Sequence, residues 1–398
     1  MQNDLLIALD SDGGVVLMLL DLSAAFDTID HSILLRRLYT LGIRGPALQW
    51  FKSYLSNRKQ AVYLNKTKSS LRDLPYGVPQ GSVLGPILFT LYTLPLGQIA
   101  TKYGLKYHIY ADDTQLYISF KPQDPTSLAG EIENIQCCFL EIKQWMTDNL
   151  LKLNGDKTEL LISINKHKRQ ASPLQTVNLD GEVIELSSTI RNLGAHFNIP
   201  LDHSDFINVK CKAAHYSLRN ISRVRSTLTR KACETVINAY VTSKMDYCNC
   251  LLYGVPSYAM ERLQKVQNYA ARVITKTPKY DHITPVLADL HWLPVKYRIE
   301  YKILLYVYKA LHEEAPDYIS ELLVPYIPPR SLRSGDMPQG HRLIPPAVIP
   351  NYNCYGDRAF QNAAPILWNS LDQSVKDAPS SSAFKSRLKT YLFDLAYF

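Results

Sequence analysis

The chain has 398 residues, a formal net charge of +8 and 46% hydrophobic residues, which is the composition of an ordinary soluble globular protein. This length exceeds what a single compact core normally holds, so we expect two or three domains. The seven cysteines are odd in number and irregularly spaced, which indicates reduced thiols in an intracellular protein, nuclear or cytoplasmic and not secreted. The mild basic excess permits a polyanionic partner.

Several function classes are disfavoured by missing signals. The most apolar run, Val15–Leu20, is far too short to cross a bilayer, so no membrane partner is expected. The N-terminus lacks the basic segment and cleavage site of a signal peptide. The sequence contains no phosphate-binding GxxxxGK loop, and no GxGxxG motif follows a predicted strand. Both observations disfavour a P-loop or Rossmann nucleotide site.

The first half of the chain alternates between strand and helix signals. Gly13–Leu22 predicts a buried strand, and His31–Tyr54 predicts a long helical stretch that is broken at Gly45. Gln60–Asn65 alternates like a strand. The glycine- and proline-rich segment Gly77–Pro86 predicts a loop that leads into a buried helix. Asp27 and Asp30 are expected to cap the helix that follows them, and Ser82 is a candidate cap for the next helix.

Further strands and one strong helix follow. Leu105–Phe120 predicts two strands joined by a tight turn, and the next segment, from Pro125, predicts an amphipathic helix. Leu153–Ile164 predicts a turn into a strand. An Asp-Gly pair between alternating runs predicts a hairpin at Asp180 and Gly181. A further short strand is predicted in the segment "NLGAHFNI".

After about residue 203 helical patterns replace strands. The expected helices run from Phe206 to Val224, Arg230 to Cys248 and Tyr258 to Ile274, and two short helices close the chain after a proline-rich loop, Pro325–Pro350. Residues 203–303 hold 16 lysines and arginines but only 7 acids, so the basic excess of the chain lies there. These charges form either a solvated helical surface or a surface that faces phosphates.

The chemistry is indicated by adjacent acids in "YADD". Asp112 and Asp113 lie between two β-prone runs, and neighbouring side chains can converge only where the backbone turns. Asp21 ends another buried strand, where an acid is costly unless it faces a cleft or binds something. Two facing carboxylates repel unless a cation lies between them, and oxygen ligands favour Mg²⁺ or Mn²⁺. The three acids predict a two-metal site for phosphoryl transfer; an isolated Asp-Asp would more simply be a surface turn.

The sequences of five segments resemble the catalytic blocks of reverse transcriptases, and they follow in the same order and with the same spacing. In particular, "DLSAAFDTIDH" and "GVPQGSVLGP" resemble those of LINE-type, non-LTR retrotransposons. The sequence after residue 203 resembles the C-terminal region of LINE polyproteins, so the resemblance covers nearly the whole chain. The five blocks are "LLDLSAAFDTIDH", "GVPQGSVLGPILF", "YADDTQLY", "NLLKLNGDKTEL" and "NLGAHFN".

The resemblance implies roles for individual residues. Asp21, Asp112 and Asp113 would bind the metal ions, with the backbone carbonyl of Leu22 assisting Asp21. Phe26 would lie beneath the incoming sugar, where its ring would clash with a ribose 2′-OH and so select deoxynucleotides. Taken alone, Phe26 would more simply be a core aromatic residue.

The remaining blocks supply further contacts. Gln80 and Gly81 would contact the incoming nucleotide and the template, with the glycine permitting close backbone approach. Lys157 would donate a proton to the pyrophosphate or contact a phosphate; alone it would more often be a surface lysine. The primer-grip block would steady the primer end with Asn192, Leu193 and Gly194.

The expected fold is an α+β right-hand polymerase palm, an antiparallel sheet with packed helices. We expect the palm with partial fingers at residues 1–200, a basic helical thumb at 203–310 and a C-terminal extension at 311–398. Only about twenty residues precede Asp21, so most of the fingers, and the endonuclease usual in the family, are expected to be missing.

The implied function is RNA-directed DNA polymerisation with dNTPs, an RNA template and a DNA primer. The alternatives are a catalytically inactive nucleic-acid-binding remnant, an RNA-templated RNA polymerase, which Phe26 disfavours, and an unexpressed or misfolded product.

Overall fold

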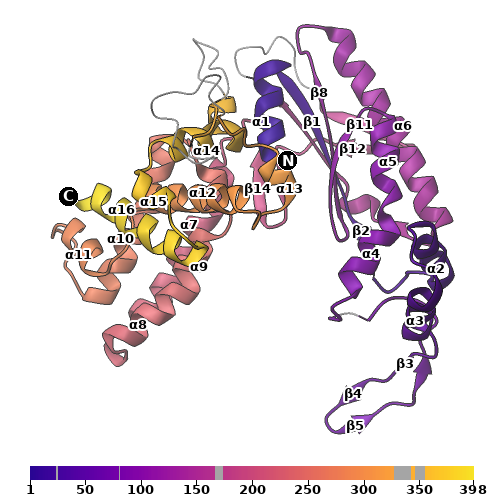
Figure 1. The fold of residues 1–398 in the computed structure, drawn as a ribbon, viewed down its shortest axis with the longest axis horizontal. Coiled ribbons are helices and arrows are strands. Elements are labelled where there is room, and N and C mark those ends of the chain that lie inside the picture. The colour runs from indigo at the N-terminus through magenta and orange to yellow at the C-terminus, as the bar shows by residue number, and fades with distance from the viewer. Residues whose placement is uncertain (24–25, 80, 166–173, 327–341, 346–354) are drawn as a thin grey trace. The chain divides into compact units, whose positions relative to one another are not determined.

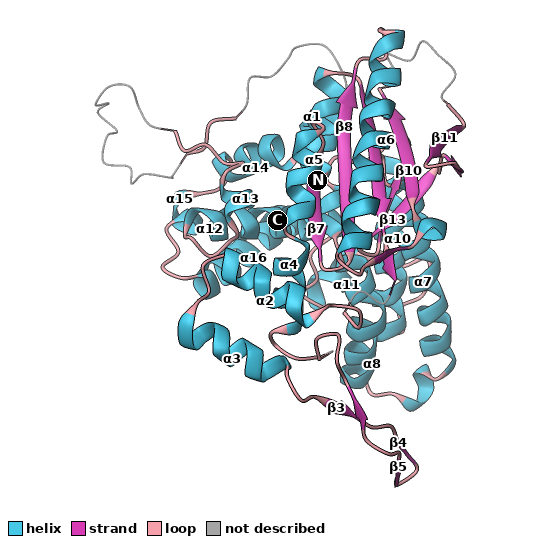
Figure 2. Cartoon of the chain, turned by 90° about the vertical axis from the view of Figure 1, so that its right-hand side faces the viewer, coloured by secondary structure: helices cyan, strands magenta, loops and turns pink. Residues whose placement is uncertain are grey.

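The computed structural model describes residues 1–23, 26–79, 81–165, 174–326, 342–345 and 355–398. Their contacts divide the chain into two compact units. Unit 1 comprises residue 1 and residues 12–193, and unit 2 comprises residues 2–11 and 194–398. The two units together contain both helices and sheets (Figure 1, Figure 2). The boundaries expected at residues 200 and 310 stay predictions.

Unit 1 is built on a four-stranded antiparallel sheet with the strand order β10-β1-β8-β7. The central strand is buried on both faces, which explains its uninterrupted apolar sequence. Val16 and Met18 join the core that α5 and α6 complete, whereas Val15 and Leu17 point to the other face and are also buried. The sheet strands are β1 (Gly14–Leu20), β7 (Lys106–Tyr110), β8 (Asp113–Phe120) and β10 (Glu159–Ile164).

Five helices and several two-stranded ribbons complete unit 1. The helices are α2 (His31–Thr40), α3 (Gly45–Leu55), α4 (Gly85–Thr93), α5 (Pro95–Lys102) and α6 (Pro125–Asp148). The short strands are β2 (Leu22–Ser23), β3 (Lys59–Gln60), β4 (Tyr63–Leu64), β5 (Thr67–Lys68), β6 (Arg72–Asp73), β9 (Lys152–Leu153), β11 (Thr176–Leu179), β12 (Glu182–Glu185) and β13 (Thr189–Asn192). These assignments confirm the buried strand, the broken helical stretch, the helix after the GVPQG loop and the long helix from Pro125.

Three local predictions are confirmed in atomic detail. Asp30 caps α2, because its carboxylate accepts a hydrogen bond of 2.9 Å from the Ile33 amide. Asp180 and Gly181 both have positive φ, at 53° and 85°, which is the requirement of a tight type I′ hairpin turn between β11 and β12. Ser82 Oγ likewise accepts a hydrogen bond of 3.0 Å from the Gly85 amide at the start of α4.

The strand expected at Gln60–Asn65 is only partly correct. Backbone pairing exists in two separate pieces, β3 with β6 and β4 with β5. Between them the Ser69 amide donates to the Val62 carbonyl at 2.9 Å, but the Val62 amide donates to the side-chain Oγ of Ser69, also at 2.9 Å. A side chain therefore replaces one backbone acceptor of the ladder that the alternating pattern predicts.

Unit 2 is mainly helical, as the sequence predicts for residues after 203. Beside β14 (Ala195–Asn198), its longer helices are α1 (Gln2–Ser11), α7 (Ser204–Arg223), α8 (Arg230–Ile237), α10 (Ser257–Thr275), α12 (Val295–Leu311), α14 (Phe360–Asn369) and α16 (Ser381–Tyr397). The shorter ones are α9 (Ser243–Asp246), α11 (Thr284–Asp289), α13 (Asp317–Ser320) and α15 (Gln373–Lys376). Most of the expected loop over Pro325–Pro350 lies outside the described residues. Among the described helices, none is long and apolar enough to cross a membrane.

The first helix belongs to unit 2 although it begins the chain. Leu5, Leu6 and Leu9 are fully buried. The Asp10 carboxylate accepts hydrogen bonds from the amides of Tyr355 and Gly356, at 2.9 and 2.6 Å. These contacts join the two ends of the sequence within one core.

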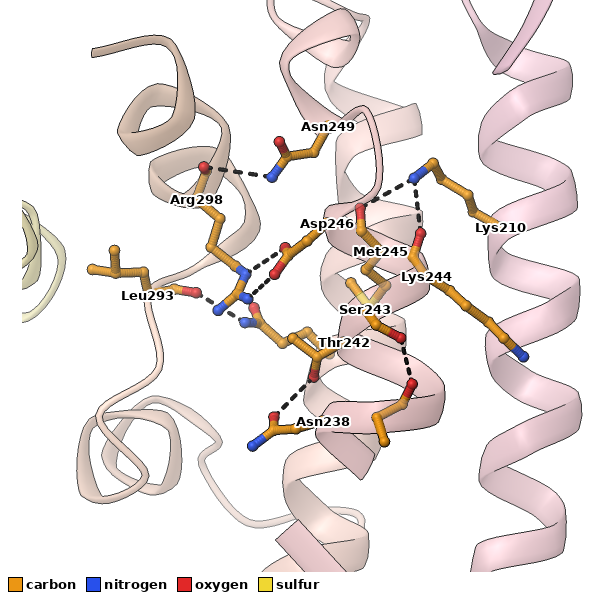
Figure 3. Close-up of polar contacts among 12 residues, drawn as sticks. Lys210, Asn238, Thr242, Ser243, Lys244, Met245, Asp246, Asn249, Leu293 and Arg298 are labelled. Atoms are coloured by element: carbon orange, nitrogen blue, oxygen red, sulfur yellow. Dashed lines mark hydrogen bonds and ion pairs between the residues drawn. The ribbon is translucent and has the colours of Figure 1, made fainter. Parts of the chain in front are cut away.

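The helix expected over Arg230–Cys248 contains a break. The chain widens into a π-helical turn at Asn238–Thr242 before α9 begins. Figure 3 shows the polar contacts that hold this region: Arg298 forms a two-pronged ion pair with Asp246, and the buried Lys210 ammonium donates to the carbonyls of Lys244 and Met245. Lys210 thus covers carbonyl groups that the end of α9 leaves unpaired.

Candidate active site

The first predicted site acid, Asp21, directly follows the central strand of unit 1. The register of β1 with β8 pairs Leu19 with Gln115 and Leu20 with Thr114. Asp21, one residue further along, therefore lies opposite Asp113, the first residue of β8. The two acids come from segments more than ninety residues apart, and the antiparallel pairing alone brings them to the same edge of the sheet.

The paired acids lie at a tight turn between β7 and β8. Tyr110 pairs with Asp113, so Ala111 and Asp112 form a two-residue turn, as predicted. Ala111 has a φ of +52°, a left-handed conformation that costs a residue with a Cβ about 1–3 kcal/mol. The fold maintains this strained turn, which keeps Asp113 in register while Asp112 remains in the turn.

A cavity of about 330 Å³ opens at this edge of the sheet. It brings together four of the predicted site residues, Asp21, Asp113, Lys157 and Asn192, whereas Asp112 is not among its lining residues. The remaining walls are provided by Leu19, Leu20, Thr114, Gln115, Glu159 and Arg191.

The carboxylate of Asp21 is held by two polar groups. Its Oδ2 lies 3.2 Å from the Lys157 ammonium and accepts a hydrogen bond of 3.3 Å from Asn154 Nδ2. Lys157 is 67% exposed in its side chain and Asp21 only 24%, so the lysine reaches inward from solvent to a partly buried acid. Lys157 is the last residue of a short 3₁₀ turn, Gly155–Lys157, that precedes β10, which confirms the turn expected there.

Negative charge is concentrated at Asp113. Burial, followed by the nearby charges of Asp112 and Asp21, raises the pKa of Asp113 above its ordinary value, and the Lys157 cation opposes that rise. All three predicted acids therefore interact electrostatically at one place. Their ionised forms repel, and Lys157 offsets only part of this repulsion.

Two carboxylates, those of Asp21 and Asp113, line this cavity. Carboxylate oxygens are the type of ligand that Mg²⁺ and Mn²⁺ prefer. Lys157 already places one positive charge on Asp21. Within the described part of the chain, no three histidine, cysteine, aspartate or glutamate side chains are gathered closely enough to enclose a metal ion.

The described residues that are expected to contact the nucleotide do not line the acidic cavity. Phe26 packs on Phe89 of α4, with ring centroids 4.8 Å apart, and is only partly buried at the edge of the core. Leu22 is buried in β2. Gly81 has a φ of +78° and open space where a Cβ would lie, so its glycine is required by the backbone turn. Gln80 lies outside the described residues.

The first two sequence blocks are joined by backbone hydrogen bonds. The Val78 amide donates to the Phe26 carbonyl at 2.9 Å, and the Gly77 amide donates to the Ile29 carbonyl at 2.8 Å. Gly77 has a φ of +84°, and a Cβ there would lie only 3.0 Å from two backbone carbonyl oxygens. Only glycine permits this approach, which fixes the GVPQG loop beside the segment that follows Asp21.

The primer-grip block is tied to the acidic hairpin by a contact that the sequence did not predict. Gln115 Nε2 donates a hydrogen bond of 2.8 Å to Asn192 Oδ1, and the two side chains are only 3% and 7% exposed. Leu193 and Gly194 follow with φ values of 46° and 81°, as in a tight turn. Gln115 lies two residues after Asp113 on the same strand face, and this spacing is the one signal that could have indicated it.

The sequence matches a family model over residues 5–197, and the family is described as "Reverse transcriptase (RNA-dependent DNA polymerase)". Residues 5–197 belong to the reverse transcriptase family. The match spans the first four blocks that suggested the resemblance and all but the last residue, Asn198, of the primer-grip block.

Similar proteins place this reverse transcriptase domain with those of LINE-type mobile elements. Three Drosophila melanogaster proteins are similar: the probable RNA-directed DNA polymerase from transposon BS, with 27% identity over 70% of this chain; that from mobile element jockey, with 25% over 68%; and that from transposon X-element, with 26% over 72%. The alignments cover only 29–31% of the length of these relatives.

A structural comparison finds telomerase from Candida albicans in complex with a fragment of telomeric RNA. The similarity covers 81% of this chain and 52% of that one, with a TM-score of 0.37 and 13% sequence identity. These values are too low to establish a shared fold.

Proposed function

We propose that the reverse transcriptase domain catalyses RNA-directed DNA synthesis, in which a nucleotide is transferred from a dNTP to the 3′-OH of a DNA primer. The observation that carries the proposal is the convergence of Asp21 and Asp113, from adjacent strands, on one cavity together with Lys157. We also propose that residues 1–200 form the polymerase palm with partial fingers, residues 203–310 a basic thumb and residues 311–398 an extension.

In the reaction, the primer 3′-oxygen forms a bond to the α-phosphorus while the bond to the pyrophosphate breaks, and the hydroxyl proton passes to solvent. Mg²⁺ or Mn²⁺ held by Asp21, Asp112 and Asp113 would supply Lewis acidity for the hydroxyl and charge neutralisation for the pyrophosphate. Lys157, 3.2 Å from Asp21 and largely exposed, is placed to exchange that contact for a phosphate oxygen and to protonate the leaving pyrophosphate.

Substrate positioning is assigned to the neighbouring blocks. We assign Phe26 to exclusion of the ribose 2′-OH, supported by its ring at the rim of the core next to Phe89. The backbone carbonyl of Leu22, together with Gln80 and Gly81, is assigned to the incoming nucleotide and the template. The turn that starts at Asn192 is assigned to the primer end and comprises Asn192, Leu193 and Gly194.

Primer extension tests the proposal. Purified chain is given poly(rA)–oligo(dT), Mg²⁺ and dTTP, next to a double variant with Asp112→Ala and Asp113→Ala. Extension by the parent and none by the variant is the expected result. Failure of both, with retained binding of the primer–template, would instead support the alternative of a nucleic-acid-binding protein without polymerase activity.

That alternative has one observation of its own in favour. The net positive charge of the chain lies in residues 203–303, outside the acidic cavity, and would bind nucleic acid without any chemistry. Salt-sensitive binding that survives loss of the carboxylates would be common to both functions, so only extension distinguishes them.

A further inference from the structure

A protruding arm of unit 1 has no role in the acidic cavity. The arm comprises residues 58–73, which run out along β3 and β4, turn at Asn65 and Lys66, and return along β5 and β6 (Figure 1, Figure 2). Asn65 and Lys66 both have positive φ, at 45° and 69°, as a two-residue hairpin turn requires. Except for Ala61, every residue of the arm is exposed.

The arm exposes apolar side chains that a water-facing hairpin would normally avoid. Val62 is 71% exposed, Tyr63 70% and Leu64 71%, and Leu71 on the return strand is 58% exposed. An isolated two-stranded hairpin is marginally stable in water, and such a patch usually marks a binding surface. The pairing of Tyr63 with Lys68 places an aromatic ring and a cation side by side on one face.

The charges of the arm identify the kind of partner. It carries five basic residues and a single acid, Asp73, which forms an ion pair with Lys59 at 3.5 Å. Among the described residues, no acid lies within ion-pair distance of Lys66, Lys68 or Arg72. A second copy of this arm would bring like charges together, so charge complementarity favours a polyanion.

The combination of cations with exposed apolar and aromatic side chains selects among polyanions. In a duplex the bases are stacked inside, and cations meet the phosphates without needing apolar partners. In a single strand the base faces are open, and aromatic side chains stack on them while cations contact the backbone. We propose that the arm of residues 58–73 binds single-stranded RNA, with Tyr63 as a stacking platform and Lys66, Lys68 and Arg72 as phosphate contacts. That this strand is the unpaired template rests on the proposed function; the binding itself does not.

Fluorescence anisotropy with labelled oligo(rU), recorded over a range of salt concentrations, tests the proposal. One variant carries Lys66→Ser, Lys68→Ser and Arg72→Ser. Each lost phosphate contact lowers the slope of log affinity against log salt by about 0.7 for a single strand, so the slope falls by about 2. A control variant removes three exposed cations elsewhere in unit 1, with Arg36→Ser, Lys106→Ser and Lys121→Ser, and keeps the parent slope.

A second variant, Tyr63→Ser, separates stacking from charge. It is expected to weaken oligo(rU) binding by roughly 5- to 150-fold with the salt slope unchanged, which is the range for loss of one stacked base. Because Tyr63 is exposed and outside the core, circular dichroism should show the parent fold. Three results would overturn the proposal. Both arm variants could bind oligo(rU) like the parent, the arm variants could lose binding to duplex but not to oligo(rU), or Tyr63→Ser could dissociate a dimer. Poly(rA)–oligo(dT) extension is scored separately, so an inactive chain whose arm variants lose oligo(rU) binding would contradict the proposed function and leave the arm assignment standing.

Discussion

The bond between Gln115 and Asn192 gives a sharp test of how the acidic hairpin and the primer-grip block are coupled. In Gln115→Met the apolar side chain has similar length but no donor, so the buried Asn192 Oδ1 loses its 2.8 Å partner. Leaving a buried acceptor unpaired costs about 1–3 kcal/mol. Replacing both residues, with Asn192→Leu added, removes donor and acceptor together and should cost less than the sum of the two single changes.

Urea unfolding followed by circular dichroism measures these free energies, and a double-mutant cycle isolates the coupling. Gln136 supplies a matched control, because its Nε2 also donates, to the Asn178 carbonyl at 2.7 Å, but at the surface. We expect Gln136→Met to cost no more than about 0.5 kcal/mol. A coupling energy near zero between Gln115 and Asn192, or equal costs for the variants at Gln115 and Gln136, would refute the reasoning.

Four further predictions follow from the site and its surroundings. Because the pKa of Asp113 is raised in the fold, its ionised form destabilises the protein, so stability falls as pH rises above the ordinary aspartate pKa of 3.8. In thermal melts without metal, Asp113→Asn should therefore be more stable than the parent at neutral pH, and this gain should disappear in acid. The same variant should lose primer extension. Ala111→Gly should raise stability by about 1 kcal/mol in urea unfolding by relieving the left-handed turn, and no gain would show that the turn is unstrained. Phe26→Ala should raise rUTP incorporation relative to dTTP by about tenfold or more, whereas a parent that already prefers rUTP would indicate an RNA polymerase. Lys210→Met should destabilise unit 2 by about 1–3 kcal/mol because three backbone carbonyls lose their donor, and a parent-like melt would contradict this.

The sequence predicted the elements that local pattern determines. The uninterrupted apolar run identified β1, and the apolar spacing after Pro125 identified α6. The Asp180-Gly181 turn followed from backbone conformation alone. The adjacency of Asp21 and Asp113 was also accessible, because an acid at each strand end predicts a shared edge.

What the sequence did not reveal depends on contacts between distant segments. The partners of the Gln115–Asn192 bond are 77 residues apart, and the only local signal is the position of Gln115 on the same strand face as Asp113. Likewise, α1 is stabilised through Asp10 by amides near the other end of the chain. In the arm, the side chain of Ser69 replaces a backbone acceptor for the Val62 amide, and the alternating pattern cannot show this. Tertiary partners decided each of these cases.

Binding of Mn²⁺, followed by the electron paramagnetic resonance signal of the free ion, tests most directly whether Asp21 and Asp113 form a divalent-metal site. The parent chain should bind Mn²⁺ in competition with Mg²⁺. The double variant Asp21→Asn with Asp113→Asn should lose that binding, while Asp148→Asn, an exposed acid on α6, should retain it. Equal Mn²⁺ binding by the parent and the double variant would contradict the assignment of this cavity as the catalytic centre.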